Sequence, residues 1–118
     1  MFQDNAIWMG TGEKHVNLLL NQANRHGLIA GASGTGKTVT LKVMAEGFSK
    51  AGVPVFMADV KGDVTGMCEA GKDSEDMQER IKRFGIEGFT FEGCPTRFWD
   101  MLGGTGLPVR ITISDMGP

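Results

Sequence analysis

The chain has 118 residues, a length that fits one domain, with the apolar and charged content of ordinary soluble globular proteins. Its net charge of −2 excludes a uniformly basic surface for nucleic acid, although a local loop or an assembled ring could still bind DNA. No apolar run is long enough to span a membrane, and the first residues lack the basic start and apolar stretch of a signal peptide. We therefore expect a cytoplasmic protein that does not insert into membranes.

Residues 1–23 are expected to form a hairpin that leads into the main domain, residues 24–118. Residues 6–10 and 16–20 are the two strand candidates, and Thr-Gly-Glu-Lys at 11–14 is typical of a turn. The turn superficially resembles a phosphate loop, but Glu13 separates its glycine from its lysine.

A strand, a glycine-rich loop and a helix are predicted next. Residues 26–30 are a short apolar run, as in a buried parallel strand. Residues 31–38 spell Gly-Ala-Ser-Gly-Thr-Gly-Lys-Thr, a complete Walker A pattern. Residues 39–50 contain no proline and repeat apolar side chains on one helical face, which we expect to be buried: Leu41, Met44, Ala45 and Phe48.

Each residue type in this loop suits a bound triphosphate. The glycines let the chain curl so that backbone N–H groups approach the phosphates, and the following helix directs its positive end at them. Lys37 supplies a cation for the β- and γ-phosphates, and Thr38 offers a hydroxyl to Mg²⁺. We predict ATP and Mg²⁺ as cofactors, Lys37 as catalytic, Thr38 as the metal-side residue, and nucleotide contacts from Gly31, Ala32, Ser33, Gly34, Thr35, Gly36, Lys37, Thr38 and Val39.

Asp59 is the second catalytic candidate. It follows residues 53–58, an apolar segment expected to be a strand parallel to 26–30 with a right-handed crossover. The carboxyl end of such a strand lies near the phosphates, so Asp59 either assists the metal or has a loop-ordering or relay role. Lys61 is a contact for phosphate, DNA or a neighbouring subunit, or simply an exposed lysine. Asp59–Gly62 also fits the Asp-x-x-Gly pattern of GTPases, but no guanine-reading Asn-Lys-x-Asp follows, which favours ATP.

The rest of the chain is less regular. Ser74 is expected to cap a helix that runs to about Phe84 and stops at Gly85. Residues 89–91, 97–99 and 109–113 are short strand candidates. Because a P-loop sheet needs more strands than these, we expect the N-terminal piece of a longer protein. Arg25 and His26 are expected to be structural or surface residues, and Cys68 and Cys94 to be reduced thiols.

Residues 24–41, together with 53–63 and their Asp-Val-Lys-Gly-Asp segment, resemble the HerA-like helicase family, with a weaker likeness over 107–118. The resemblance implies an α/β P-loop NTPase (RecA-like) fold, with a mostly parallel sheet flanked by helices that is incomplete here. It also implies ATP hydrolysis coupled to movement on duplex DNA in a homo-oligomeric, hexameric ring. Lys37 and Thr38 match the family's phosphate and Mg²⁺ residues, whereas its Walker B acid, sensor and arginine finger lie beyond residue 118.

Two other functions remain open at this point. One is a small-molecule or nucleotide kinase, and the other is a non-catalytic module whose binding is gated by nucleotide. Stimulation of ATPase activity by duplex DNA would favour the motor, and phosphate transfer to a small acceptor would favour the kinase.

Overall fold

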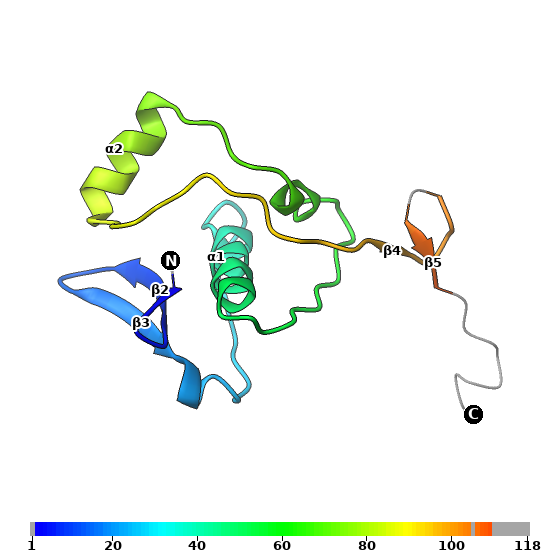
Figure 1. Ribbon diagram of the computed structural model, residues 1–118, viewed down its shortest axis with the longest axis horizontal. Coiled ribbons are helices and arrows are strands. Elements are labelled where there is room, and N and C mark those ends of the chain that lie inside the picture. Colours follow the sequence, from blue (N-terminus) through cyan, green and yellow to red (C-terminus); the bar gives the residue numbers. More distant parts are fainter. Residues whose placement is uncertain (1, 105, 110–118) are drawn as a thin grey trace.

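The computed structural model describes residues 2–104 and 106–109. It measures 52 × 32 × 31 Å and holds an N-terminal sheet, two α-helices and a small C-terminal strand pair (Figure 1). The elements in chain order are β1 (Phe2–Gln3), β2 (Ala6–Thr11), β3 (His15–Leu19), η1 (Leu20–Gln22), α1 (Lys37–Lys50), η2 (Thr65–Cys68), α2 (Glu75–Phe84), β4 (Trp99–Asp100) and β5 (Leu107–Pro108).

The N-terminal sheet is an antiparallel meander in the order β1-β2-β3. The strands β2 and β3 confirm the hairpin predicted for residues 6–10 and 16–20. The additional strand β1 is connected to β2 by Asp4 and Asn5, whose φ angles of 52° and 58° are left-handed. Asp and Asn tolerate this conformation better than most residues, so they suit a tight turn here.

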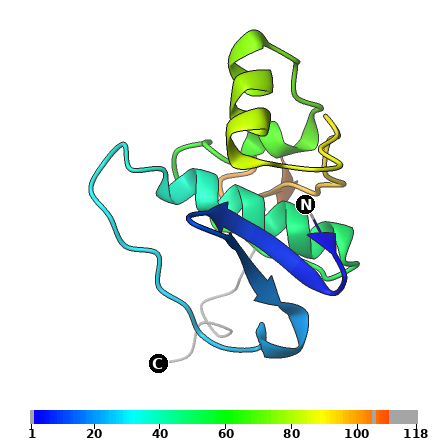
Figure 2. The same cartoon turned by 90° about the vertical axis from the view of Figure 1, so that its left-hand side faces the viewer.

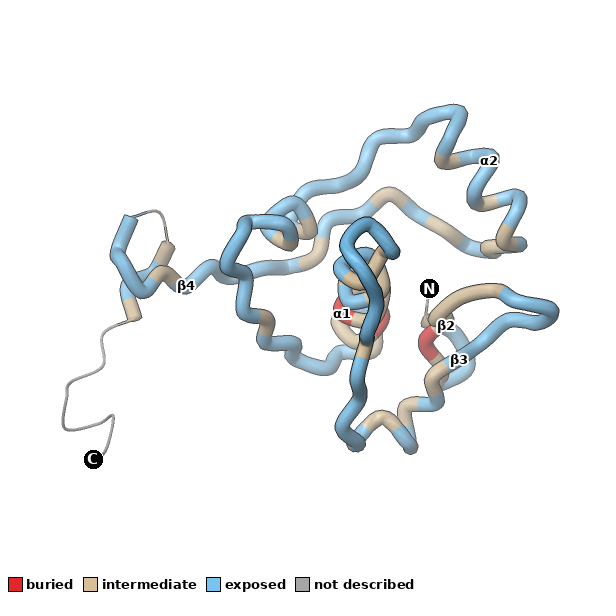
Figure 3. The backbone as a smooth tube through the Cα atoms, turned by 180° about the vertical axis from the view of Figure 1, so that it is seen from behind, coloured by how far each residue is buried: buried red, intermediate tan, exposed pale blue. Residues whose placement is uncertain are grey.

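The core lies where this sheet meets α1. Ile7 on β2 is fully buried, and Gly47 and Ala45 on α1 are buried as well (Figure 3). A Cβ atom at Gly47 would lie 3.0 Å from Cγ1 of Ile7, so the glycine lets the strand approach the helix closely. In Figure 2 the hairpin lies across one side of α1. Of the predicted apolar face, Ala45 is buried and Met44 and Phe48 are half-buried, whereas Leu41 stays 44% exposed.

The helix α2 confirms its predicted limits. Ser74 accepts a hydrogen bond from the N–H of Met77, and Gly85 ends the helix with a left-handed φ of 60°. The end of α2 is joined to the hairpin, because the hydroxyl of Thr11 donates to the carbonyl of Phe84 over 2.9 Å.

The prediction of a mostly parallel sheet is wrong for the described residues. Neither 26–30 nor 53–58 is a strand, and residues 89–91 are not one either. Among residues 2–104 and 106–109, the only parallel pair is β4 with β5. A parallel strand is stable only when neighbours accept its backbone hydrogen bonds and cover both faces. Within the described part of the chain 26–30 and 53–58 find no such neighbours, and Leu28 and Phe56 are 90% and 89% exposed. The structure is thus a small α/β arrangement and does not display a P-loop fold, although residues 110–113 of the last predicted strand lie outside the described residues.

Candidate nucleotide-binding site

The Walker A segment forms a curled loop that ends at the first residue of α1. Gly34 and Gly36 have φ angles of 78° and 90°, a left-handed region that favours glycine. Gly31 is needed for another reason: a Cβ there would lie 2.5 Å from the hydroxyl oxygen of Thr35. The glycine positions therefore shape the loop in the way that the sequence predicts.

Lys37 lies across the inside of this loop. Its ammonium nitrogen donates to the carbonyl oxygen of Ala32 over 2.7 Å, and the hydroxyl of Thr35 donates to the same oxygen over 2.7 Å. The Ala32 carbonyl is thus the anchor that holds the lysine over the loop. The sequence predicts Ala32 as a nucleotide contact but does not reveal this anchoring role, because a backbone acceptor leaves no side-chain signal.

A shallow, open cavity of about 290 Å³ lies against this loop, lined by Gly34, Gly36, Lys37, Thr38 and Val39. It sits at the N-terminus of the 14-residue helix α1, where the first backbone N–H groups have no partner within the helix and carry positive partial charge. Such a helix end suits a phosphate group. A larger hollow of about 550 Å³ beside α2 has no comparable loop among its lining residues.

Asp59 is the centre of a second ordered loop. One carboxylate oxygen accepts the N–H groups of Gly62 at 2.9 Å and Asp63 at 3.1 Å, and the other accepts that of Val64 at 2.9 Å. These bonds, that from Val64 foremost, lower the pKa of Asp59 below its usual 3.8 by stabilising the charged form. Within the described residues the hydrogen bonds of this carboxylate all stay in its own loop. The geometry supports a loop-ordering role, and the metal-side role stays a prediction.

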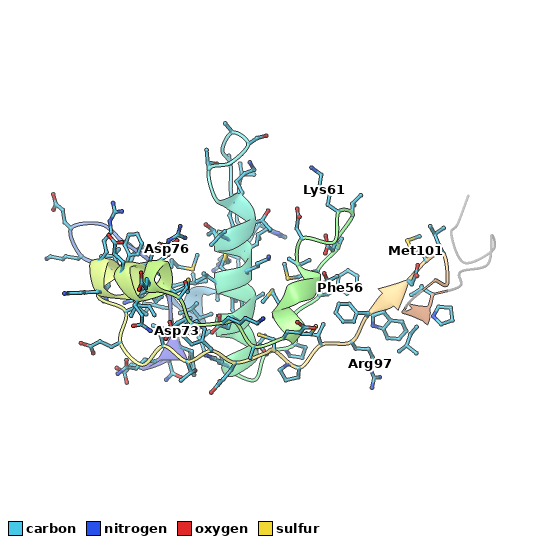
Figure 4. All side chains as sticks on the ribbon, turned by 90° about the horizontal axis from the view of Figure 1, so that it is seen from above. Phe56, Lys61, Asp73, Asp76, Arg97 and Met101 are labelled. Atoms are coloured by element: carbon cyan, nitrogen blue, oxygen red, sulfur yellow. The ribbon has the colours of Figure 1, made fainter. Side chains whose placement is uncertain are left out.

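Lys61 lies at the tip of the Asp59 loop and is exposed. Figure 4 shows it on the side of the molecule toward which the Walker A end of α1 points. Arg25 and His26 are also exposed, as expected of surface residues.

The candidate protein ligand for Mg²⁺ is the exposed hydroxyl of Thr38. In the described ranges no three His, Cys, Asp or Glu side chains gather to hold a metal. The hydroxyl of Thr38, which lines the open cavity beside the Walker A loop, nevertheless fits Mg²⁺ held mainly by a nucleotide. This ion is usually bound through one or two protein oxygens plus substrate phosphates.

Comparison with protein families matches residues 4–118 to the helicase HerA-like C-terminal family. The chain belongs to the HerA-like family. This match confirms the family inferred from residues 24–41 and 53–63, and it extends the likeness through most of the N-terminal hairpin. HerA-like proteins are in general ATPases and helicases that use ATP and Mg²⁺. Comparisons with curated proteins and with solved structures gave no match.

No helix in residues 2–104 and 106–109 has the length and apolar character needed to cross a bilayer.

Proposed function

We propose that this chain binds Mg-ATP at residues 31–39 and serves as part of a HerA-type motor that hydrolyses ATP on duplex DNA. The observation that carries the proposal is the Walker A loop at the start of α1, with Lys37 held across it. The family match supports the same activity class, since HerA-like proteins are generally ATPases and helicases.

In this proposal Lys37 exchanges one acceptor for a stronger one. Its ammonium now bonds the neutral carbonyl of Ala32, whereas phosphate oxygens are charged and form shorter, stronger hydrogen bonds. The lysine therefore turns from Ala32 toward the β- and γ-phosphates when ATP enters. Backbone N–H groups of the loop and of the first turn of α1 bind the remaining phosphate oxygens.

Thr38 is the residue that would contact Mg²⁺, which lowers the charge repulsion between the phosphates. Two roles are considered for Asp59, one in ordering its loop and one in assisting the metal. Its present hydrogen bonds hold the loop that carries Lys61, and a metal-side duty requires one of the carboxylate's remaining acceptor positions.

Calorimetric titration with Mg-ATP tests the binding site. The variant Lys37→Ala removes a charged hydrogen-bond donor to phosphate, a loss of about 1.5–3 kcal/mol, so the Kd should rise about 10- to 100-fold. Lys72→Ala, which removes an exposed lysine outside the loop, is the matched control and should leave the Kd unchanged. Equal affinity of wild type and Lys37→Ala in folded proteins would refute the site.

The motor assignment needs a separate test in the HerA-type assembly that contains this chain. ATPase rate is measured against duplex DNA concentration at low and moderate salt, with particle mass determined in the same buffers. A DNA-stimulated rate that weakens with salt through counterion release, from a ring-sized particle, is expected. Hydrolysis by a monomer that ignores DNA at both salts would contradict the motor, and phosphate transfer to a small acceptor would indicate a kinase.

A further inference from the structure

After η2 the chain runs out to α2 and then comes back to residue 94. We call residues 67–74 the outgoing limb and residues 85–94 the returning limb of this excursion. Figure 1 shows α2 at the far end of this excursion, with the two limbs running side by side back toward η2. The limbs are joined where the N–H of Cys94 donates to the carbonyl of Met67 over 2.7 Å. This contact brings two cysteines, Cys68 and Cys94, to the same place in the fold.

A second contact shows how tightly the limbs meet. A Cβ atom at Gly93 would lie 3.0 Å from the carbonyl carbon of Cys68 and 3.2 Å from that of Glu69. The backbone of one limb thus lies directly against the backbone of the other. Only a residue without a side chain fits at position 93, which places the neighbouring Cys94 beside Cys68.

Standard bond lengths limit the separation of the two cysteines. The oxygen of Met67 lies about 2.8 Å from the Cα of Cys68 across a planar trans peptide, and the nitrogen of Cys94 lies about 1.5 Å from its own Cα. With the 2.7 Å hydrogen bond between them, the Cα atoms are at most about 7 Å apart, and closer because the path bends at both ends. Disulfides join Cα atoms about 4.4–6.8 Å apart, so this pair lies within bonding range.

We infer that Cys68 and Cys94, both free thiols in this structure, form a reversible intramolecular disulfide. The bond ties the end of η2 to the returning limb. Val64, whose N–H is held by Asp59, immediately precedes η2, so the bond also restrains the end of the Asp59 loop. On the other side, Glu92 lies 4.0 Å from the ammonium of Lys50 at the end of α1.

The chemistry uses a small-molecule disulfide such as glutathione disulfide as oxidant. The exposed Cys68 loses its proton and attacks one sulfur of the oxidant, which releases one glutathione thiolate. Cys94 then loses its proton and attacks the sulfur of Cys68, which releases the second glutathione. Two protein thiols are oxidised and one small disulfide is reduced to two thiols.

The two thiols differ in environment, which sets this order of attack. Cys94 is half-buried, and burial together with the negative charge of Glu46 raises the pKa of its thiol. A raised pKa leaves less thiolate at neutral pH, so Cys94 is the slower thiol toward an oxidant in solution. Cys68 donates a hydrogen bond from its sulfur to the carbonyl of Thr65 at 3.1 Å and must rotate away from it to reach Cys94.

The test equilibrates the reduced 118-residue chain with graded mixtures of reduced and oxidised glutathione, in native buffer and in urea. Mass spectrometry detects the internal disulfide as a loss of about 2 Da, and peptide mapping locates it. We expect the Cys68–Cys94 bond in native buffer at glutathione mixtures at least about tenfold more reducing than those required in urea, because the fold holds the thiols together. Cys68→Ser and Cys94→Ser should each yield only a glutathione adduct.

Either of two results would overturn the inference. One is a native chain that carries glutathione adducts without an internal bond. The other is a bond that forms at the same glutathione mixture in urea as in native buffer, since the fold would then contribute nothing to bringing the thiols together.

Discussion

Gly47→Ala tests the contact on which the fold around the site depends. The added methyl group would meet the side chain of Ile7, with Cγ1 at 3.0 Å and Cβ at 3.2 Å, closer than such atoms pack. Crowding of this kind in a packed core costs about 1–3 kcal/mol. In a helix interior alanine is about 1 kcal/mol more favourable than glycine, and this gain opposes the cost of crowding. The expected net result is a loss of about 0–2 kcal/mol in the free energy of unfolding.

A double-mutant cycle separates the two effects. Ile7→Ala alone should cost about 2–5 kcal/mol, because it empties the centre of the core. In the Gly47→Ala background the same change should cost about 1–3 kcal/mol less, since it also relieves the crowding. The assay is urea unfolding followed by the fluorescence of Trp8 on β2. If Gly47→Ala stabilised the protein by about 1 kcal/mol, with no coupling to Ile7, β2 would not be pressed against α1 and our account would fail.

Three further predictions concern the second helix, the Asp59 loop and catalysis. Ser74→Ala removes the side-chain acceptor for the N–H of Met77 and should destabilise α2 by about 1 kcal/mol, seen as faster amide exchange in that helix alone; unchanged exchange would contradict the cap. Asp59 has a folded-state pKa below 3.8, so its hydrogen bonds to the loop should be fully present above about that pH and be lost as pH falls through the lower folded value. Carbon NMR titration of its carboxyl carbon, with exchange of the Val64 amide, checks this, and a midpoint at or above 3.8 would refute it. The 118 residues alone should hydrolyse ATP weakly, because the family's arginine finger is expected beyond residue 118 and such a finger raises the rate about 10³- to 10⁵-fold. A turnover of about 1 s⁻¹ that Lys37→Ala abolishes would show instead that these residues hold all the catalytic groups.

The Walker A segment shows how far the sequence predicts the candidate site. The positions of glycine, the start of α1 and the presence of Lys37 in the loop all follow from contiguous residues. The direction of the Lys37 side chain does not follow, because it depends on a backbone carbonyl whose orientation the loop sets. The sequence of the Asp59 segment is compatible with a metal-side role and with a loop-ordering or relay role, and the hydrogen bonds of Asp59 to its loop are visible only in three dimensions.

The elements that the sequence determined by itself are those whose hydrogen bonds close within a few residues: the β2–β3 hairpin, the start of α1, and α2 between Ser74 and Gly85. Local turns and helix caps are determined by side chains that are neighbours in the sequence, so no distant contact is needed to form them. Only the tertiary structure decided which distant segments meet. It placed Ile7 against Gly47 and Cys68 beside Cys94, and it left residues 26–30 and 53–58 without strand partners among the described residues. Pairing between distant segments depends on loop closure and on surfaces that fit, and neither is encoded in a local pattern.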